Sequence, residues 1–177
     1  MTSKKRVVLI TGAESGIGKS TSKIFLDNGY KVICTYLKNN NNKNTKYIEY
    51  HRIDITKNKD WENLALYIKK KFKKIDVLVN SAGVRLSGNL ETTSMSDWSY
   101  HLNNNVTGTF LACKYILPFL KKAKNSSIIN VASINSIRGA KNMLAYATSK
   151  SAVISFTASL ALDLTKNKIR VNAVAPG

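Results

Sequence analysis

The chain has 177 residues, of which 44% are hydrophobic, and we expect a single globular domain over residues 1–177. No apolar run approaches the roughly 18 residues of a membrane-spanning helix, and none near the amino terminus suits a signal peptide, so a cytoplasmic protein is expected. The net charge is +18, but the lysines are dispersed and arginine is scarce. This pattern favours a solvated basic surface over a nucleic-acid or membrane partner.

Apolar runs and helical patterns alternate along the chain, which predicts an α/β fold with a doubly wound parallel sheet of the Rossmann type. In chain order, a strand at 7–10 precedes a helix at 16–28, and strands at 32–36 and 47–53 follow. The polar stretch 38–44 is predicted to be a loop. A helix at 60–72, with Asp60 as its candidate cap, leads to a strand at 76–80. The last predicted elements are a helix at 96–120, a strand at 127–131, a helix at 146–164 and a strand at 169–174.

The chain stops at Pro176-Gly177, directly after the last predicted strand. A buried parallel strand needs helices on its faces, so we expect the sequence to be incomplete at its carboxyl end.

Cysteine and histidine give no indication of a metal site. Cys34 and Cys113 lie in apolar surroundings without metal-ligand spacing, and we expect reduced core residues. His51 and His101 have no second ligand at a suitable spacing and are expected to be surface or helix residues.

Three glycines indicate a nucleotide site. Gly12, Gly16 and Gly18 follow the first predicted strand and open the first helix. In this context a glycine-rich backbone and a helix amino terminus approach a pyrophosphate. The spacing is G-x-x-x-G-x-G, which differs from the usual G-x-G-x-x-G dinucleotide fingerprint.

A tyrosine and a lysine four residues apart indicate acid–base chemistry. Tyr146 and Lys150 share one face of the predicted helix 146–164. The nearby ammonium favours the phenolate, which makes the phenol usable as an acid or base near neutral pH. Ordinary alternatives exist, because Tyr146 could be a core residue, Ser133 a capping hydroxyl and Asn105 a turn residue.

Taken together, the motifs resemble the short-chain dehydrogenase/reductase family, especially its 3-oxoacyl-carrier-protein reductases and alcohol dehydrogenases. They occur in family order from Thr11 to Gly177, and members of the family usually continue past this point into a last strand and a flap over the substrate. The motifs are Thr11-Gly12-x-x-x-Gly16-Ile17-Gly18, Asp54-Ile55, Asn80-Ser81-Ala82-Gly83, Asn105-x-x-Gly108, Ser133, Tyr146-x-x-x-Lys150 and Pro176-Gly177.

The resemblance implies four catalytic residues. Tyr146 would exchange a proton with the substrate oxygen, and Lys150 would lower the pKa of the tyrosine and hold the nicotinamide ribose. Ser133 would hydrogen-bond the substrate oxygen, and Asn105 would fix a proton-relaying water. The residues implied to contact the cofactor are Gly12, Ser15, Gly16, Ile17, Gly18, Tyr36, Lys38, Asp54, Ile55, Asn80, Ala82, Gly83, Tyr146, Lys150, Pro176 and Gly177.

The choice between NAD(H) and NADP(H) depends on the end of the second strand. Tyr36 stands where an acidic side chain would repel a 2′-phosphate. The glycine turn has Glu14 and Ser15 in place of the arginine of many NADP-dependent relatives, while Lys38 or Lys43 could reach a phosphate. These residues slightly favour NADP(H).

The expected activity is the interconversion of a small-molecule carbonyl and a secondary alcohol. The resemblance also implies a homo-oligomer, a dimer or tetramer, formed through helices 106–120 and 146–164. Two alternatives remain: a catalytically silent nucleotide-binding or partner-binding module on the same fold, and a nucleic-acid-binding protein, which only the charge suggests.

Overall fold

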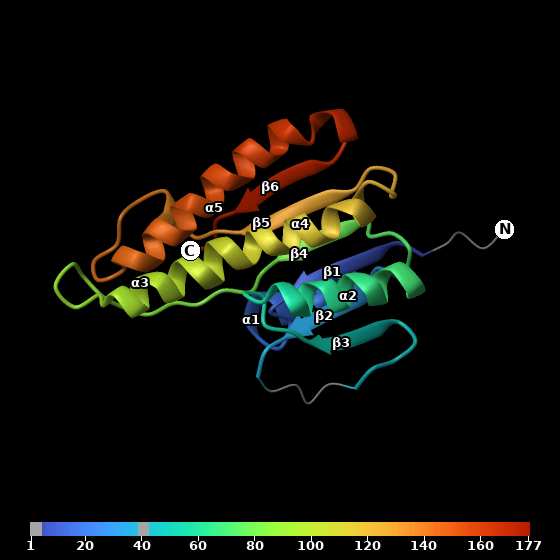
Figure 1. Ribbon diagram of the computed structural model, residues 1–177, viewed down its shortest axis with the longest axis horizontal. Helices are drawn as coiled ribbons and strands as arrows, with labels where there is room; N and C mark the ends of the chain where they lie inside the picture. The colour runs from blue at the N-terminus through green and yellow to red at the C-terminus, as the bar shows by residue number, and fades with distance from the viewer. Residues whose placement is uncertain (1–4, 39–42) are drawn as a thin grey trace.

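The computed structural model describes residues 5–38 and 43–177, and within them the chain forms one six-stranded sheet in the order β3-β2-β1-β4-β5-β6. Neighbouring strands pair in parallel, and their arrows point toward the side on which α3 and the carboxyl terminus lie (Figure 1). This confirms the predicted doubly wound fold. The strands are β1 (Val7–Thr11), β2 (Lys31–Tyr36), β3 (Ile48–Arg52), β4 (Val77–Asn80), β5 (Ser127–Val131) and β6 (Arg170–Val174).

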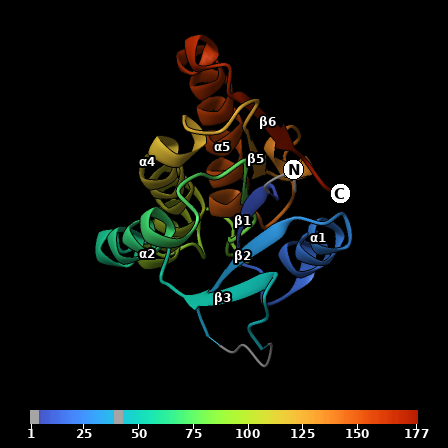
Figure 2. The same cartoon turned by 90° about the vertical axis from the view of Figure 1, so that its right-hand side faces the viewer.

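Helices cover both faces of the sheet. Figure 2 shows α1 on one side and α2 and α4 on the other, and residues of α5 join the same core as α2 and α4. The predicted helix 96–120 is divided into α3, a π-helical segment at Leu102–Thr107, and α4. The α-helices are α1 (Gly16–Asp27), α2 (Asn58–Lys71), α3 (Met95–His101), α4 (Gly108–Leu120) and α5 (Leu144–Asp163).

The central strand β1 shows why the apolar runs are continuous. Val8 and Ile10 pack with the α1 side of the core, whereas Val7 and Leu9 pack with the α2 and α4 side. A parallel strand buried on both faces needs apolar side chains at successive positions rather than at alternate ones.

The expected cap of α2 is wrong. Lys57 precedes the helix, and Asp60 lies in its first turn, where the helix dipole favours a negative charge. The Asp60 carboxylate accepts a hydrogen bond from the main-chain N–H of Asp54 at 2.7 Å, so it fixes the loop after β3 instead. Within the predicted loop 38–44, residues 39–42 lie outside the described part of the chain.

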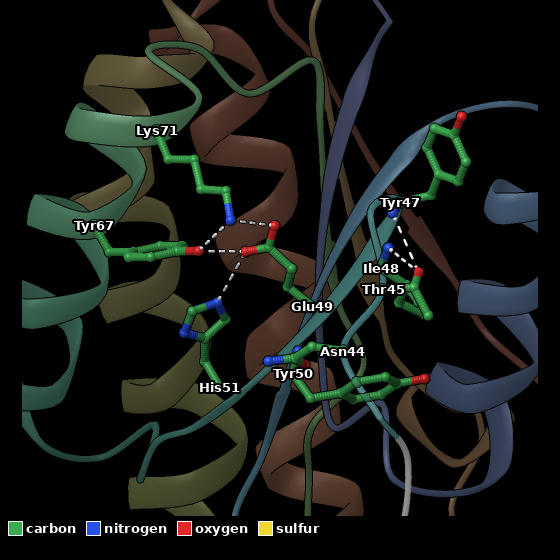
Figure 3. A network of polar contacts seen from close by, with 9 residues as sticks. All are labelled: Asn44, Thr45, Tyr47, Ile48, Glu49, Tyr50, His51, Tyr67 and Lys71. Carbon is green, nitrogen blue, oxygen red and sulfur yellow. Dashed lines mark hydrogen bonds and ion pairs between the residues drawn. The ribbon is translucent and has the colours of Figure 1, made fainter.

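A polar cluster joins β3 to α2 (Figure 3). The Glu49 carboxylate forms an ion pair with Lys71 at 2.7 Å and accepts a hydrogen bond from the Tyr67 hydroxyl. Burial raises the pKa of Glu49, but its contacts with Lys71 and Tyr67 outweigh that effect and leave the pKa below its ordinary value. His51 lies on β3, with its ring 4.6 Å from that of Tyr67, so it is a half-buried strand residue rather than a surface or helix residue.

The two cysteines are buried and free, as expected. Burial raises the pKa of the Cys34 and Cys113 thiols to about 12, so both are protonated at neutral pH. Among the described residues, no helix is long and apolar enough to cross a membrane.

Candidate active site

A cleft runs along the carboxyl edge of the sheet. It consists of a cavity of about 750 Å³ and a smaller one of about 330 Å³. The two share four lining residues at the amino end of α1 and after β4, so they form one continuous surface. The strand order changes direction between β1 and β4, and ligands of open α/β sheets bind outside the carboxyl ends of strands at such a point. The shared lining residues are Ile17, Ser81, Gly83 and Val84.

The glycine turn brings main chain close to main chain. Gly12 has a φ of +65°, and a Cβ placed on it would lie 2.7 Å from the Cα of Ala82. A Cβ on Gly18 would lie 2.2 Å from the carbonyl oxygen of Gly12, so this residue allows α1 to start directly against the turn. By contrast, no atom of residues 5–38 and 43–177 lies within 4 Å of a Cβ placed on Gly16, so these residues leave open space at the turn.

The larger cavity fits a dinucleotide in the chemistry of its lining. The amino end of α1 lines it, and the Ser15 side chain makes no capping bond to that helix. Thr35 also lines it, with a buried Oγ1 that has no hydrogen-bond partner within residues 5–38 and 43–177. Free main-chain N–H groups and uncommitted hydroxyls suit phosphate and ribose groups.

Three of the predicted catalytic residues meet at the smaller cavity. Tyr146 and Lys150 extend from α5, and Ser133 follows β5. Lys150 is buried, and its Nζ donates a hydrogen bond of 2.6 Å to the carbonyl oxygen of Val131. Burial lowers the pKa of the Lys150 ammonium to about 8. A proton on this nitrogen is therefore exchangeable near neutral pH.

Ser133 also caps a short turn. It precedes the 3-10 turn Ile134–Ser136, and its Oγ accepts a hydrogen bond of 3.2 Å from the N–H of Asn135. The capping interpretation is thus correct, and it fixes the position of the hydroxyl. The same hydroxyl retains its own proton as a donor toward the cavity.

Asn105 lies inside the protein rather than on the cleft surface. Its Oδ1 accepts from the N–H of Val84 at 2.7 Å, and its Nδ2 donates to the Val84 carbonyl at 3.0 Å and to Ser149 at 2.8 Å. A Cβ on Gly83 would lie 2.9 Å from this Oδ1 and 3.4 Å from Nζ of Lys150. Asn105 therefore clamps the segment after β4, and its side chain is fully engaged by protein groups.

The other predicted residues divide into those on the cleft and those away from it. Asn80 is interior, and its amide donates to Asn130 at 2.8 Å. Asp54 lines a neighbouring cavity of about 410 Å³ and accepts hydrogen bonds from Thr56, while Gly18 packs against Gly12. The predicted residues that line the two main cavities are Gly12, Ser15, Gly16, Ile17, Tyr36, Lys38, Ile55, Ala82, Gly83, Ser133, Tyr146, Lys150, Pro176 and Gly177.

His101 was expected to be a surface or helix residue, and it is a helix residue that is buried. It is on α3, as its polar helix suggested, but it is only 1% exposed. Its Nε2 accepts from the N–H of Leu86 at 2.9 Å, so Nδ1 carries the proton and donates to the carbonyl oxygen of Asp97 at 2.7 Å. Its ring lies edge-on to that of Tyr146, with centroids 6.3 Å apart.

Sequence reasoning also missed the roles of Thr11 and Arg85. Oγ1 of Thr11 accepts hydrogen bonds of 3.0 Å from the N–H groups of both Ser81 and Ala82, which joins the ends of β1 and β4. Arg85 lines the smaller cavity beside the catalytic residues. Thr11 belongs to the glycine motif, whereas Arg85 lies outside every motif.

The chain is similar in sequence to a known family of enzymes. A family model described as short chain dehydrogenase matches residues 6–177. The 3-oxoacyl-[acyl-carrier-protein] reductase FabG of Thermotoga maritima is 36% identical over 180 residues, which cover 97% of this chain and 73% of that protein.

Two solved structures are also similar. The structure of ElxO with NADP bound has a TM-score of 0.91 and 36% identity, over 98% of this chain and 74% of that one. A short chain dehydrogenase from Leptospira borgpetersenii with bound NAD+ has a TM-score of 0.92 and 29% identity, over 98% of this chain and 71% of that one.

Proposed function

Because the chain belongs to the short-chain dehydrogenase family of oxidoreductases, we propose that it interconverts a carbonyl compound and a secondary alcohol with a nicotinamide dinucleotide. One observation carries the proposal. Ser133, Tyr146 and Lys150 line one cavity, and this cavity is continuous with the one at the glycine turn. The side chains that would exchange a proton therefore lie next to the cavity that would hold the cofactor.

Each catalytic side chain has a role that follows from its position. A nicotinamide cofactor, when bound, would supply or accept the hydride. Tyr146 donates its proton to the carbonyl oxygen during reduction and takes it back during oxidation. Ser133 hydrogen-bonds the same oxygen and stabilises the charge that develops on it. Lys150, with a pKa of about 8, replaces the proton that Tyr146 donates.

Main-chain groups would hold the cofactor. The turn at Gly12 and Gly16, with the amino end of α1, would take the pyrophosphate. Ala82 and Gly83 would lie along the nicotinamide ribose, and Ile55 along the adenine.

We propose NADP(H) over NAD(H) as the cofactor. Lys38 lines the larger cavity and offers a positive charge near the end of β2, and Tyr36 adds no negative charge. Glu14 acts against this preference. Its carboxylate lies 3.3 Å from the N–H of Leu37, just after β2, where a negative charge would repel a 2′-phosphate. The named neighbours do not decide the matter, because one binds NADP and another binds NAD+.

The decisive experiment is a titration with NADPH and with NADH, followed by cofactor fluorescence and thermal unfolding. A ligand that binds only the folded state raises the unfolding temperature. Saturable binding with oxidation of the cofactor by members of a carbonyl panel would support the proposal. Folded protein that binds neither cofactor would refute it, and binding without turnover would favour a silent nucleotide-binding module.

We further propose a homo-oligomer formed through α4 and α5. Phe110 is 45% exposed on α4, and its ring lies 6.4 Å from that of Phe156 on α5. Leu162, near the end of α5, is 79% exposed. These apolar side chains would be covered by the same helices of a second copy. Sedimentation as a monomer at micromolar concentration would contradict this arrangement.

A further inference from the structure

The segment after β4 is held at every second residue. Asn105 bonds both the N–H and the carbonyl of Val84, and His101 accepts the N–H of Leu86. Both anchors are only 1% exposed and belong to the helical stretch that begins with α3. They act as fixed points for the main chain on either side of Arg85.

The same segment is held once more, two residues further on. Gly88 donates its N–H to the carbonyl of Asn142 at 2.8 Å, and its own carbonyl accepts from the N–H of Leu144 at 3.1 Å. The segment is therefore joined to the start of α5, the helix that carries Tyr146. Arg85 is the residue between the first two anchors, and its position relative to the catalytic helix is set by the main chain.

Arg85 lines the smaller cavity together with Ser133, Tyr146 and Lys150. Its side chain is exposed and makes no hydrogen bond or ion pair with any of residues 5–38 and 43–177. An arginine carries five N–H donors in a planar fork that matches a carboxylate or a phosphate. Its donors are therefore free to bind a ligand at this position.

The charged side chains that line the smaller cavity are both basic. Within the described part of the chain, the residues that line it include Arg85 and Lys150 and no aspartate or glutamate. Lys150 is buried and one of its three donors is bonded to the Val131 carbonyl, so the exposed guanidinium of Arg85 is the more accessible cation. A concave surface with one sign of charge raises the local concentration of ligands of the opposite sign.

We propose that Arg85 binds an anionic group of the substrate, a carboxylate or a phosphate, while the substrate carbonyl lies at Tyr146 and Ser133. The substrate class is then a ketone or secondary alcohol that carries a negative charge. This inference rests on the proposed function, because it assumes that the smaller cavity receives the reacting carbonyl.

The test uses two matched pairs of ketones as probes. The first pair is 3-oxobutanoate and its methyl ester, and the second is dihydroxyacetone phosphate and dihydroxyacetone. Binding is measured by calorimetry to the chain saturated with oxidised cofactor, which cannot reduce a ketone. A salt concentration of about 150 mM screens diffuse lysine effects. Failure of the cofactor to bind would refute the proposed function, and the ketones are then titrated without it, so the two failures are distinguishable.

We expect at least one anionic ketone to bind about tenfold or more tightly than its neutral partner. The pair that shows the difference identifies the group as a carboxylate or a phosphate. Arg85→Gln should remove most of this preference without changing the binding of the neutral ketone, and Arg85→Lys should retain part of it. Arg170→Gln is the matched control, because Arg170 is an exposed arginine at the start of β6 and the cleft lies at the carboxyl ends of the strands. It should change the binding of neither the anionic nor the neutral ketone.

Three outcomes would overturn the inference. The first is equal binding of the anionic and neutral members of both pairs. The second is a preference that survives in Arg85→Gln. The third is that folded chain binds neither anionic ketone, with or without the cofactor.

Discussion

The Nζ of Lys150 donates a hydrogen bond of 2.6 Å to the carbonyl oxygen of Val131, the last residue of β5. This bond fixes the end of the lysine side chain against the sheet, one helical turn from Tyr146 on α5. Burial of the side chain at this position lowers the pKa of Lys150 to about 8, so the ammonium has a proton that is exchangeable near neutral pH. The hydrogen bond sets the position of the ammonium, and burial sets its acidity.

The first prediction concerns Tyr146→Phe. Loss of the phenolic hydroxyl should lower kcat by about 10²–10⁴-fold, because a positioned acid–base group contributes about that much to the rate. The affinity for NADPH and NADH should change little, since the ring remains. Steady-state kinetics and cofactor titration measure the two effects separately. A variant with full activity would show that another group exchanges the proton.

The second prediction concerns the pH dependence of stability. Lys150 has a pKa of about 8 in the folded chain, below the value of about 10.4 in the unfolded chain. Between these values the unfolded state binds more protons, so stability rises with pH. The free-energy penalty of burying the charged amine is fully present below about pH 8. It is lost as the pH rises from the pKa of the folded chain to that of the unfolded chain.

Lys150→Met isolates this effect. A difference of about 2.4 pKa units, at about 1.4 kcal/mol each, corresponds to about 3 kcal/mol. Relative to wild type, the variant should therefore lose stability by up to this amount between pH 7 and pH 10.5, because only wild type gains. Urea unfolding of both proteins at several pH values measures it. A gap between the two that does not change with pH would contradict the prediction.

The third prediction concerns the Asn105 clamp. Asn105→Ala leaves the N–H and carbonyl of Val84 and the hydroxyl of Ser149 without their partner, at a cost of about 2–4 kcal/mol in the free energy of unfolding. Asn104→Ala removes an exposed hydrogen bond to the Tyr100 carbonyl and should cost less than about 1 kcal/mol. Equal destabilisation in the two variants would mean that the clamp contributes little.

The fourth prediction concerns cofactor choice at the end of β2. Glu14→Gln removes a negative charge beside the N–H of Leu37. The ratio of NADPH affinity to NADH affinity should therefore rise several-fold. Lys38→Met should weaken NADPH binding and leave NADH binding unchanged. Lys166→Met, remote from the cleft, is the control for overall charge. If neither variant alters the NADPH-to-NADH ratio, other residues decide the cofactor.

The fifth prediction concerns acid stability and the cluster in Figure 3. The pKa of Glu49 is below its ordinary value, so the stability it contributes is present above about pH 4.5 and lost as the pH falls through the folded value. Glu49→Gln should destabilise the chain by about 1–2 kcal/mol at pH 7 and by less at pH 3. Thermal unfolding at both pH values measures this, with Glu62→Gln on the exposed face of α2 as control.

Sequence and structure agree best where the signal is local. The run at 7–10, the glycine turn and the spacing of Tyr146 and Lys150 each depend on neighbours within a few residues. Periodicity and turn chemistry of this kind determine the strands, the helices and the order of the motifs. They predicted the fold, whereas the resemblance to a family implied the shared role of Ser133 and Tyr146, which line one cavity.

Only the tertiary structure decided which polar side chains face inward. His101 lies in a polar stretch, and nothing nearby in the sequence indicates that its ring accepts the N–H of Leu86. Asn105 is bonded to a residue 21 positions away, and Arg85 reaches the cavity because the main chain around it is anchored to distant helices. Such contacts join segments that are far apart in the chain, so packing sets them and local pattern does not.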